Sequence, residues 1–320
     1  MSAADIAALL AAAGWSGAAR EALAGDASGR RYFRLRRGGE SAVLMVAPAD
    51  AALAAFIDVG ARLAALGLST PQLLAERRTA GLLLLEDFGD ALFARRLDAG
   101  APAAPLYELA VDVLIHLHRN FDVAGAGSLP RYDAATFLDQ VMLFAEVVLP
   151  AALPAFRQAW AETLPAAYGG PISLLLRDYH VGNLVHLPER SGIAACGLLD
   201  FQDAGLGPPA YDLVSLLEDA RRDVDEALRL SLQGRYLAAF PDLDRQDFAA
   251  SCHVLALMRH FRVIGIFSRL ARQRGRPEYL VHLPRLWRLI EAHLAAPAVR
   301  PVAAWLDAWL PRKARPGFRP

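Results

Sequence analysis

Hydrophobic and polar positions follow different patterns in the first quarter of the chain and in the rest. Apolar residues recur at helical spacing over residues 3–13 and again over residues 51–68, which predicts two amphipathic helices. Between them, the pattern of residues 21–48 predicts three strands separated by two turns, and the segment GLLLLEDFGD at 81–90 begins as a buried strand. The pattern predicts a small lobe built from a sheet and helices.

The remainder of the chain has a mainly helical pattern. Two short apolar runs, LVHL at 184–187 and IAACGLL at 193–199, flank the turn PERSG and predict a β-hairpin. We therefore expect an α+β fold with a small β-rich lobe over residues 1–86 and a larger helical lobe over residues 87–320. The segments that predict helices in the larger lobe are 108–121, 209–223, 225–240, 247–275 and 283–294.

Composition excludes several classes of partner. The 320 residues are 55% hydrophobic with mean hydropathy +0.25, enough for a large core. Lys plus Arg and Asp plus Glu both number 34, so the formal net charge is zero, and no overall field attracts nucleic acid or an anionic membrane. We expect no nucleic-acid partner and no membrane partner, and the pattern does not indicate an oligomeric state.

Targeting signals are also missing from the pattern. The first residues, MSAADIAALLAAAGW, have no basic region before the apolar run, and no charge-free stretch of about twenty apolar residues follows. Cys196 and Cys252 lie in apolar contexts without metal-ligand spacing. These features predict a cytoplasmic protein with two buried thiols and no transmembrane segment.

Three polar residues around the predicted hairpin point to phosphoryl transfer. Asp178 precedes Asn183 by five residues, and Asp200 follows the second strand. A tight hairpin returns the chain to its starting point, so Asn183 and Asp200 are expected to lie close together. Mg²⁺ prefers such oxygen ligands, and Asp178 is then the candidate that orients or deprotonates an attacking hydroxyl.

The same segments resemble a known family. RDYHVGN and LLDFQDAGLGPPAYDLVSLL are similar to the catalytic loop and the metal-binding segment of the aminoglycoside phosphotransferase family. The resemblance implies a protein-kinase-like two-lobed fold, with ATP and Mg²⁺ as cofactors. It also implies the catalytic role for Asp178 and the metal-binding role for Asn183 and Asp200.

Four motifs in order give a narrower resemblance. GDASGRRYFRL, LLLLEDFGD, LLRDYHVGNL and GLLDFQDAGLGPPAYDLVSLLEDARRDV together resemble the bacterial cell-wall sugar kinases. That group phosphorylates N-acetylmuramate and N-acetylglucosamine at the C1 hydroxyl, which implies an amino-sugar substrate. Two alternatives stay open: a kinase for choline, homoserine or an aminoglycoside, and a nucleotide-binding pseudokinase.

Residues for the nucleotide come mainly from the first turn. Ser28 and Gly29 belong to GDASGRR, whose small residues allow backbone N–H groups to approach phosphates. Kinase-like folds usually place a Lys on the third strand, but here the matching residue is Met45. Arg30 and Arg34 are the candidate replacements, because a guanidinium can grip phosphate through two hydrogen bonds.

The candidate residues for the adenine-binding hinge and for the acceptor substrate follow from the resemblance more than from the hydrophobic pattern. Glu86 and Phe88 follow the buried strand, and their backbone groups are the candidates for binding adenine. Asp203, Glu218 and Arg221 are the candidate substrate-binding residues, since carboxylates accept hydrogen bonds from sugar hydroxyls and an Arg suits a lactyl carboxylate.

Three further residues are expected to support the catalytic loop. The resemblance leads us to expect a His two residues before the catalytic Asp, but Leu176 stands there. Arg177 remains, and Asp212 on the next helix is expected to pair with it or with the loop backbone. His180 is expected to orient the loop through a ring hydrogen bond.

Overall fold

The computed structural model describes residues 2–23 and 29–315, which form two compact units. Unit 1 comprises Met1–Leu117 and Val181–Asp203, and unit 2 comprises His118–His180 and Ala204–Pro320. The boundary predicted between residues 86 and 87 therefore lies inside unit 1. The hairpin that carries Asn183 and Asp200 also belongs to unit 1, although it lies far along the sequence.

Unit 1 contains an antiparallel sheet of five strands in the order β1-β2-β3-β5-β4. The strands and hairpin predicted for residues 21–48 and 81–90 are present in it. One strand was not predicted, because the segment LLAER of β4 is largely exposed and lacks an apolar face. The bounds are β1 Ala19–Ala22, β2 Arg31–Arg37, β3 Glu40–Val46, β4 Leu73–Arg77 and β5 Leu82–Glu86.

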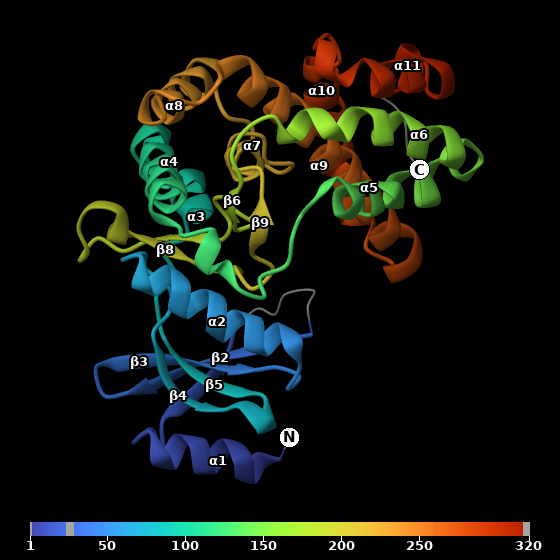
Figure 1. Cartoon of the computed structure of the whole chain (residues 1–320). Helices are drawn as coiled ribbons and strands as arrows, with labels where there is room; N and C mark the ends of the chain where they lie inside the picture. Colours follow the sequence, from blue (N-terminus) through green and yellow to red (C-terminus); the bar gives the residue numbers. More distant parts are fainter. Residues whose placement is uncertain (1, 24–28, 316–320) are drawn as a thin grey trace. The chain divides into compact units, whose positions relative to one another are not determined.

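Helices α1 (Ala3–Ala12) and α2 (Ala51–Ala65) lie on opposite faces of this sheet (Figure 1). Asp50 caps α2 by accepting hydrogen bonds from the first backbone N–H groups of the helix. On the α1 face, alternate residues of the central strands pack with Leu9 and Trp15. The opposite face of the same strands is thereby left for α2 and for a pocket.

The rest of unit 1 comprises the hairpin that carries Asn183 and Asp200, helix α3 and part of helix α4. Strands β7 (Leu184–His186) and β8 (Cys196–Leu198) pair antiparallel, which confirms the predicted hairpin. Helix α3 spans Phe93–Asp98, and the division between the units falls within α4, which spans Ala103–Asn120.

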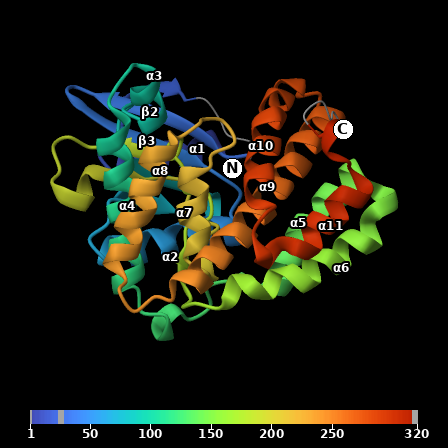
Figure 2. The same cartoon turned by 90° about the horizontal axis from the view of Figure 1, so that it is seen from above.

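Unit 2 is built around α9 (Arg245–Arg274), which contacts α5, α7 and α10. Figure 2 shows α10 beside α9. Aromatic rings fill the core, with Phe144 and Phe261 packed edge to face at 4.7 Å. Two short strands, β6 (Ser173–Leu175) and β9 (Gly205–Gly207), pair next to the catalytic loop. The other helices are α5 Ala134–Val148, α6 Leu153–Thr163, α7 Ala210–Leu217, α8 Glu226–Ala239, α10 Leu283–His293 and α11 Arg300–Trp309.

Short 3₁₀ turns connect several of these elements: Arg78–Ala80, Ala124–Ala126, Pro150–Ala152, Leu164–Tyr168, Gly192–Ala195, Pro277–His282, Pro297–Val299 and Arg312–Ala314. The helix predicted over residues 209–223 is shorter than expected. It ends at Leu217, where Glu218 leaves helical geometry with φ −130° and ψ 53°. The side chain of Glu218 enters a buried polar cluster, and this contact takes the place of another helical turn.

Helix α9 is long and apolar enough, by length and composition, to cross a membrane. However, 67% of its most apolar 18-residue stretch is buried within the protein. The core helix of a water-soluble unit gives the same pattern, so the helix is weak evidence for a membrane span.

Candidate active site

The hairpin brings Asn183 and Asp200 together. Leu184 pairs with Leu198, and the N–H of Leu199 donates to the carbonyl of Asn183 at 3.0 Å. The next residue, Asp200, has a φ of 59°, a left-handed conformation that a short polar side chain tolerates better than most. The two predicted metal ligands therefore leave the hairpin side by side.

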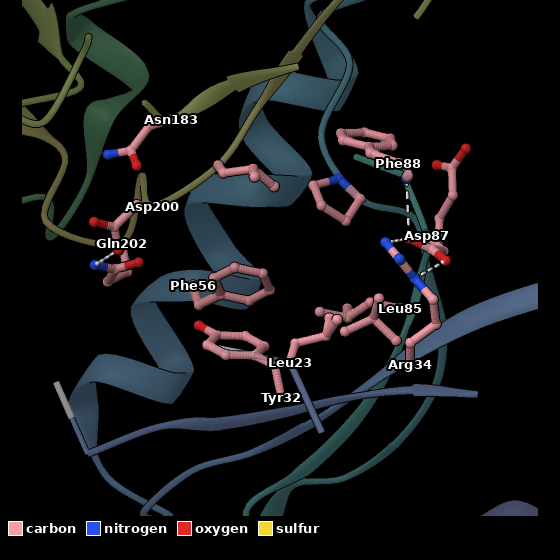
Figure 3. A pocket seen from close by; sticks show the side chains of 15 residues that line it. Leu23, Tyr32, Arg34, Phe56, Leu85, Asp87, Phe88, Asn183, Asp200 and Gln202 are labelled. Carbon is pink, nitrogen blue, oxygen red and sulfur yellow. Dashed lines mark hydrogen bonds and ion pairs between the residues drawn. The ribbon is translucent and has the colours of Figure 1, made fainter. Parts of the chain in front are cut away.

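Both residues line a cavity of about 310 Å³ in unit 1, which we call the unit 1 pocket (Figure 3). Asn183, Asp200 and Gln202 gather at one end of it, and Arg34, Asp87 and Phe88 lie at the other. Apolar side chains occupy the middle. The lining residues are Leu23, Tyr32, Arg34, Val43, Phe56, Pro71, Leu85, Glu86, Asp87, Phe88, Gly89, Asn183, Leu199, Asp200 and Gln202.

The polar end of the pocket has the donor atoms of a cation site. The Nε2 of Gln202 donates to Asp200 Oδ1 at 2.9 Å, which orients the carboxylate (Figure 3). Gln202 Oε1 is buried without a hydrogen-bond partner within the described part of the chain. An orphaned acceptor of this kind is rare in a protein interior. Amide and carboxylate oxygens are the ligands that Mg²⁺ prefers, so these residues suit that ion.

Arg30 lies beside Asp200. Its guanidinium is 3.8 Å from Asp200 Oδ1, and its side chain is 6% exposed. Gly29 precedes it with a φ of 77°, a conformation that favours glycine. The candidate Ser28 lies outside the described residues.

Arg34 has a different environment from Arg30. It forms ion pairs with Asp87 and Asp90, each at 2.7 Å, and its side chain is 8% exposed. The hydrogen bond to Asp90 leads the interactions that raise the pKa of Arg34 above its ordinary value, while burial works against them. The guanidinium therefore fastens β2 to the segment after β5.

That segment carries the two candidate hinge residues. Glu86 is the last residue of β5, and its carboxylate accepts hydrogen bonds from the Arg190 guanidinium and the Gln72 N–H. The ring of Phe88 packs on Gly197, where an added Cβ would lie 2.7 Å from the ring. Both line the unit 1 pocket, and Phe88 lies at the end opposite Asn183 and Asp200.

Sequence reasoning missed several lining residues. Phe56 of α2 stacks on Phe201 with ring centroids 4.9 Å apart, and Tyr32 lies beside it in Figure 3. The period of two along β2 places Tyr32 on the same face as Arg34, so this residue had a usable signal. Gln202 had none, because only the fold shows its contact with Asp200.

Met45, at the position where a Lys was expected, is fully buried in β3. It is paired with Tyr32 on β2 and with Leu83 on β5. A methionine in this place contributes to the core of the sheet and supplies no charge to the pocket.

In unit 2, the catalytic loop is held by Asp212 at the start of α7. Its carboxylate accepts hydrogen bonds from the N–H of Leu176 at 2.5 Å and the N–H of Arg177 at 2.9 Å. Burial raises the pKa of Asp212 to about 7, although both N–H groups act in the opposite direction. Asp178 is the next residue and is half-buried, so the contact fixes the backbone from which the candidate base projects.

Arg177 fixes the catalytic loop through contacts with side chains of unit 2. It has a φ of 72°, and its guanidinium lies 4.1 Å from the ring centroid of Tyr132 and 4.6 Å from that of Tyr211. It also donates to Gln140 Oε1 at 2.7 Å. An arginine enclosed by aromatic rings gains cation–π energy without a carboxylate partner.

The candidate acceptor residues differ in their exposure and in their partners. Asp203 is exposed in unit 1, whereas Glu218 is 5% exposed and accepts hydrogen bonds from two histidines of unit 2. The Arg221 side chain is 48% exposed, and its guanidinium lies 3.7 Å from Asp219. Burial lowers the pKa of His180, while Asp219 opposes that shift.

Comparison with known proteins gives relatives over most of the chain. The N-acetylmuramate/N-acetylglucosamine kinase of Caulobacter vibrioides is 37% identical, with 97% of each chain covered. The protein of the same name from Pseudomonas aeruginosa is 34% identical, covering 84% of this chain and 82% of that one.

Solved structures agree on the fold. The ternary complex of streptomycin, ATP and APH(2'')-IIa has a TM-score of 0.60 at 14% identity, covering 93% of this chain and 98% of the other. The predicted kinase-like α+β fold is thereby confirmed. A model of the phosphotransferase enzyme family matches residues 20–248. The chain therefore belongs to the phosphotransferase enzyme family.

Proposed function

We propose that the protein is an ATP-dependent kinase that phosphorylates N-acetylmuramate and N-acetylglucosamine at the C1 hydroxyl. The observation that carries the proposal is the polar end of the unit 1 pocket, where Asn183, Asp200 and Gln202 meet. The sugar specificity is supported by relatives of that name at 37% and 34% identity. The product is a sugar 1-phosphate, which suits recycling of peptidoglycan amino sugars into nucleotide sugars.

The step is an in-line phosphoryl transfer. The C1 oxygen of the sugar forms a bond to the γ-phosphorus of ATP, and the bond from that phosphorus to the β,γ-bridging oxygen breaks. Asp178 orients the C1 hydroxyl and accepts its proton, and ADP leaves. Asp212 and Arg177 act through the loop backbone, because their contacts fix the peptide next to Asp178.

Asn183 and Asp200 would hold Mg²⁺, with Gln202 orienting the carboxylate. When bound, the ion neutralises charge that develops on the transferred phosphoryl group. Arg30 supplies a further positive charge, since it lies 3.8 Å from Asp200 and is buried. The adenine would occupy the part of the pocket beside Glu86 and Phe88, next to the apolar side chains in its middle.

The acceptor is tested with a panel of substrates in a coupled assay for ADP release. Turnover is expected with N-acetylmuramate and N-acetylglucosamine, and none with choline or an aminoglycoside. The matched control is the methyl glycoside of N-acetylglucosamine, whose C1 oxygen is blocked. Equal turnover of the methyl glycoside would place the transfer at another hydroxyl, and turnover of a non-sugar alone would refute the assignment.

Met45 gives a reason to consider a pseudokinase, because a buried methionine cannot contact phosphate. Arg30 and the full set of Asp178, Asn183 and Asp200 favour an active enzyme. Calorimetry that detects ATP binding, combined with no phosphoryl transfer to any acceptor in the panel, would favour the pseudokinase instead.

A further inference from the structure

A cluster of three buried side chains in unit 2 takes no part in the proposed reaction. Glu218 lies at the end of α7, His260 in the middle of α9 and His293 at the end of α10. They are 5%, 0% and 7% exposed, respectively. Three helices thus direct metal-ligating side chains toward one point in the interior.

The ligand atoms converge closely. Glu218 Oε2 accepts a hydrogen bond from His260 Nε2 at 2.9 Å and another from His293 Nε2 at 2.8 Å. All three ligand atoms lie within 4.8 Å of one another. Tetrahedral zinc, with ligands about 2.0–2.2 Å away, holds its ligand atoms roughly 3.3–3.5 Å apart. If each imidazole ring moved about half an ångström away from Glu218, the spacing of the ligand atoms would fit the ion.

Among the described residues, this is the group of His, Cys, Asp and Glu side chains whose ligand atoms come together in this way. We propose that Glu218, His260 and His293 are the three protein ligands of a zinc site that joins α7, α9 and α10, with a water molecule as the fourth ligand. Two imidazoles and one carboxylate suit zinc better than Mg²⁺ or Ca²⁺, which prefer oxygen ligands throughout.

A second contact supports the assignment. His253 Nδ1 lies 2.8 Å from His293 Nδ1. When His293 binds a metal through Nε2, the proton of the neutral ring moves to Nδ1, which donates it to His253. A hydrogen bond of this kind fixes the tautomer and the orientation of most metal-ligating histidines. By contrast, His260 Nδ1 is buried without a hydrogen-bond partner in the described structure, so we expect His293 to be the better supported ligand.

The charge of the cluster agrees with the geometry. A divalent cation would offset the buried carboxylate of Glu218. Zinc binding at Glu218 would fix one end of α7. Asp212 at the other end of this helix holds the backbone of the catalytic loop, so the ion would also help to position that loop.

The test uses the full chain without an affinity tag, freed of metal by a chelator and then dialysed against micromolar Zn²⁺. We expect one zinc per chain by elemental analysis and a rise of several degrees in Tm. Failure to retain zinc at micromolar concentrations would overturn the proposal.

Variants then locate the ion. His293→Gln and Glu218→Gln are expected to lower zinc affinity at least 100-fold, and His253→Ala by about 10- to 100-fold as an outer hydrogen-bond partner. His118→Gln is the matched control, because it removes another, half-buried imidazole of unit 2, one that contacts Tyr236. Unchanged zinc binding in His293→Gln and Glu218→Gln would place the ion elsewhere and refute the site.

Two further measurements distinguish zinc binding at this site from metal binding at the proposed magnesium site and from misfolding of the variants. Asp200→Asn should retain the zinc while losing the kinase activity, which separates this site from the proposed magnesium site. Co²⁺ bound to the wild-type chain should show the visible absorption of a four-coordinate site, so the proposal stays testable if a cluster variant does not fold. A weak octahedral spectrum in place of it would count against the site.

Discussion

The unit 1 pocket and the base of the catalytic loop in unit 2 each contain a conspicuous aspartate, but the two differ in access. The side chain of Asp200 is 34% exposed and faces a cavity. Asp212 is fully buried, and its two carboxylate oxygens accept backbone hydrogen bonds. A carboxylate that is accessible from a cavity can bind a ligand, whereas a fully buried carboxylate can interact only with other groups of the protein. The chemistry of each aspartate therefore follows from its surroundings more than from its residue type.

The largest expected effect is the loss of kcat on replacing Asp200, or Asp178, the candidate base. Asp178→Asn and Asp200→Asn should each lower kcat by roughly 10³-fold or more, about 4 kcal/mol of barrier, because one removes the proton acceptor and the other a metal ligand. They should differ in calorimetry with ATP and Mg²⁺. Asp178→Asn should keep the wild-type affinity, and Asp200→Asn should weaken it.

Asp58→Asn is the matched control for both variants. Asp58 lies on the exposed surface of α2 and pairs only one turn away with Arg62, so its replacement should leave kcat within twofold of wild type. Turnover at the wild-type rate in Asp178→Asn would remove that residue from the catalytic role.

Two arginines extend the comparison within unit 1. Arg34→Gln should destabilise the chain by about 3 kcal/mol, because it leaves buried Asp87 without its ionic partner. Arg30→Gln should instead raise the KM for ATP by about tenfold, or 1.4 kcal/mol, with little change in unfolding. Urea unfolding and initial-rate kinetics on the same two proteins check the pair. If Arg34→Gln raised the KM and left stability unchanged, the two roles would have to be exchanged.

The sequence predicted the parts of the fold whose patterns are local. The hairpin of β7 and β8 followed from two apolar runs around a turn, and its geometry brought Asn183 beside Asp200. The end of α7 at Leu217 was missed because the cause is remote. Glu218 leaves the helix to meet His260 and His293, which lie 42 and 75 residues further along.

The same limit applies to the candidate site. Glu218 and Asp203 looked equivalent in the sequence as acceptors for sugar hydroxyls, yet one is sealed and the other exposed. Arg30 and Arg34 were likewise indistinguishable in one basic run. Only the partners Asp87 and Asp90, more than fifty residues away, show that Arg34 is bound to the protein itself.

The last expected effect is the pH dependence of stability that the buried carboxyl of Asp212 contributes. Burial raises the pKa of Asp212 from 3.8 to about 7, so between these values the folded state holds a proton that the unfolded state has released. The stability from this group is fully present below pH 3.8 and is lost as pH rises through 7. The protonated acid can still accept from both N–H groups, since its hydroxyl oxygen keeps lone pairs.

Urea unfolding of the wild type and of Asp212→Asn at several values between pH 5.5 and 8 isolates this contribution. The difference between their free energies of unfolding should shrink by about 2 kcal/mol across that range, because the amide does not titrate. Other titrating groups are shared by the two proteins and cancel in the difference. Parallel curves would mean that Asp212 stays ionised when folded, and that the two N–H groups outweigh burial.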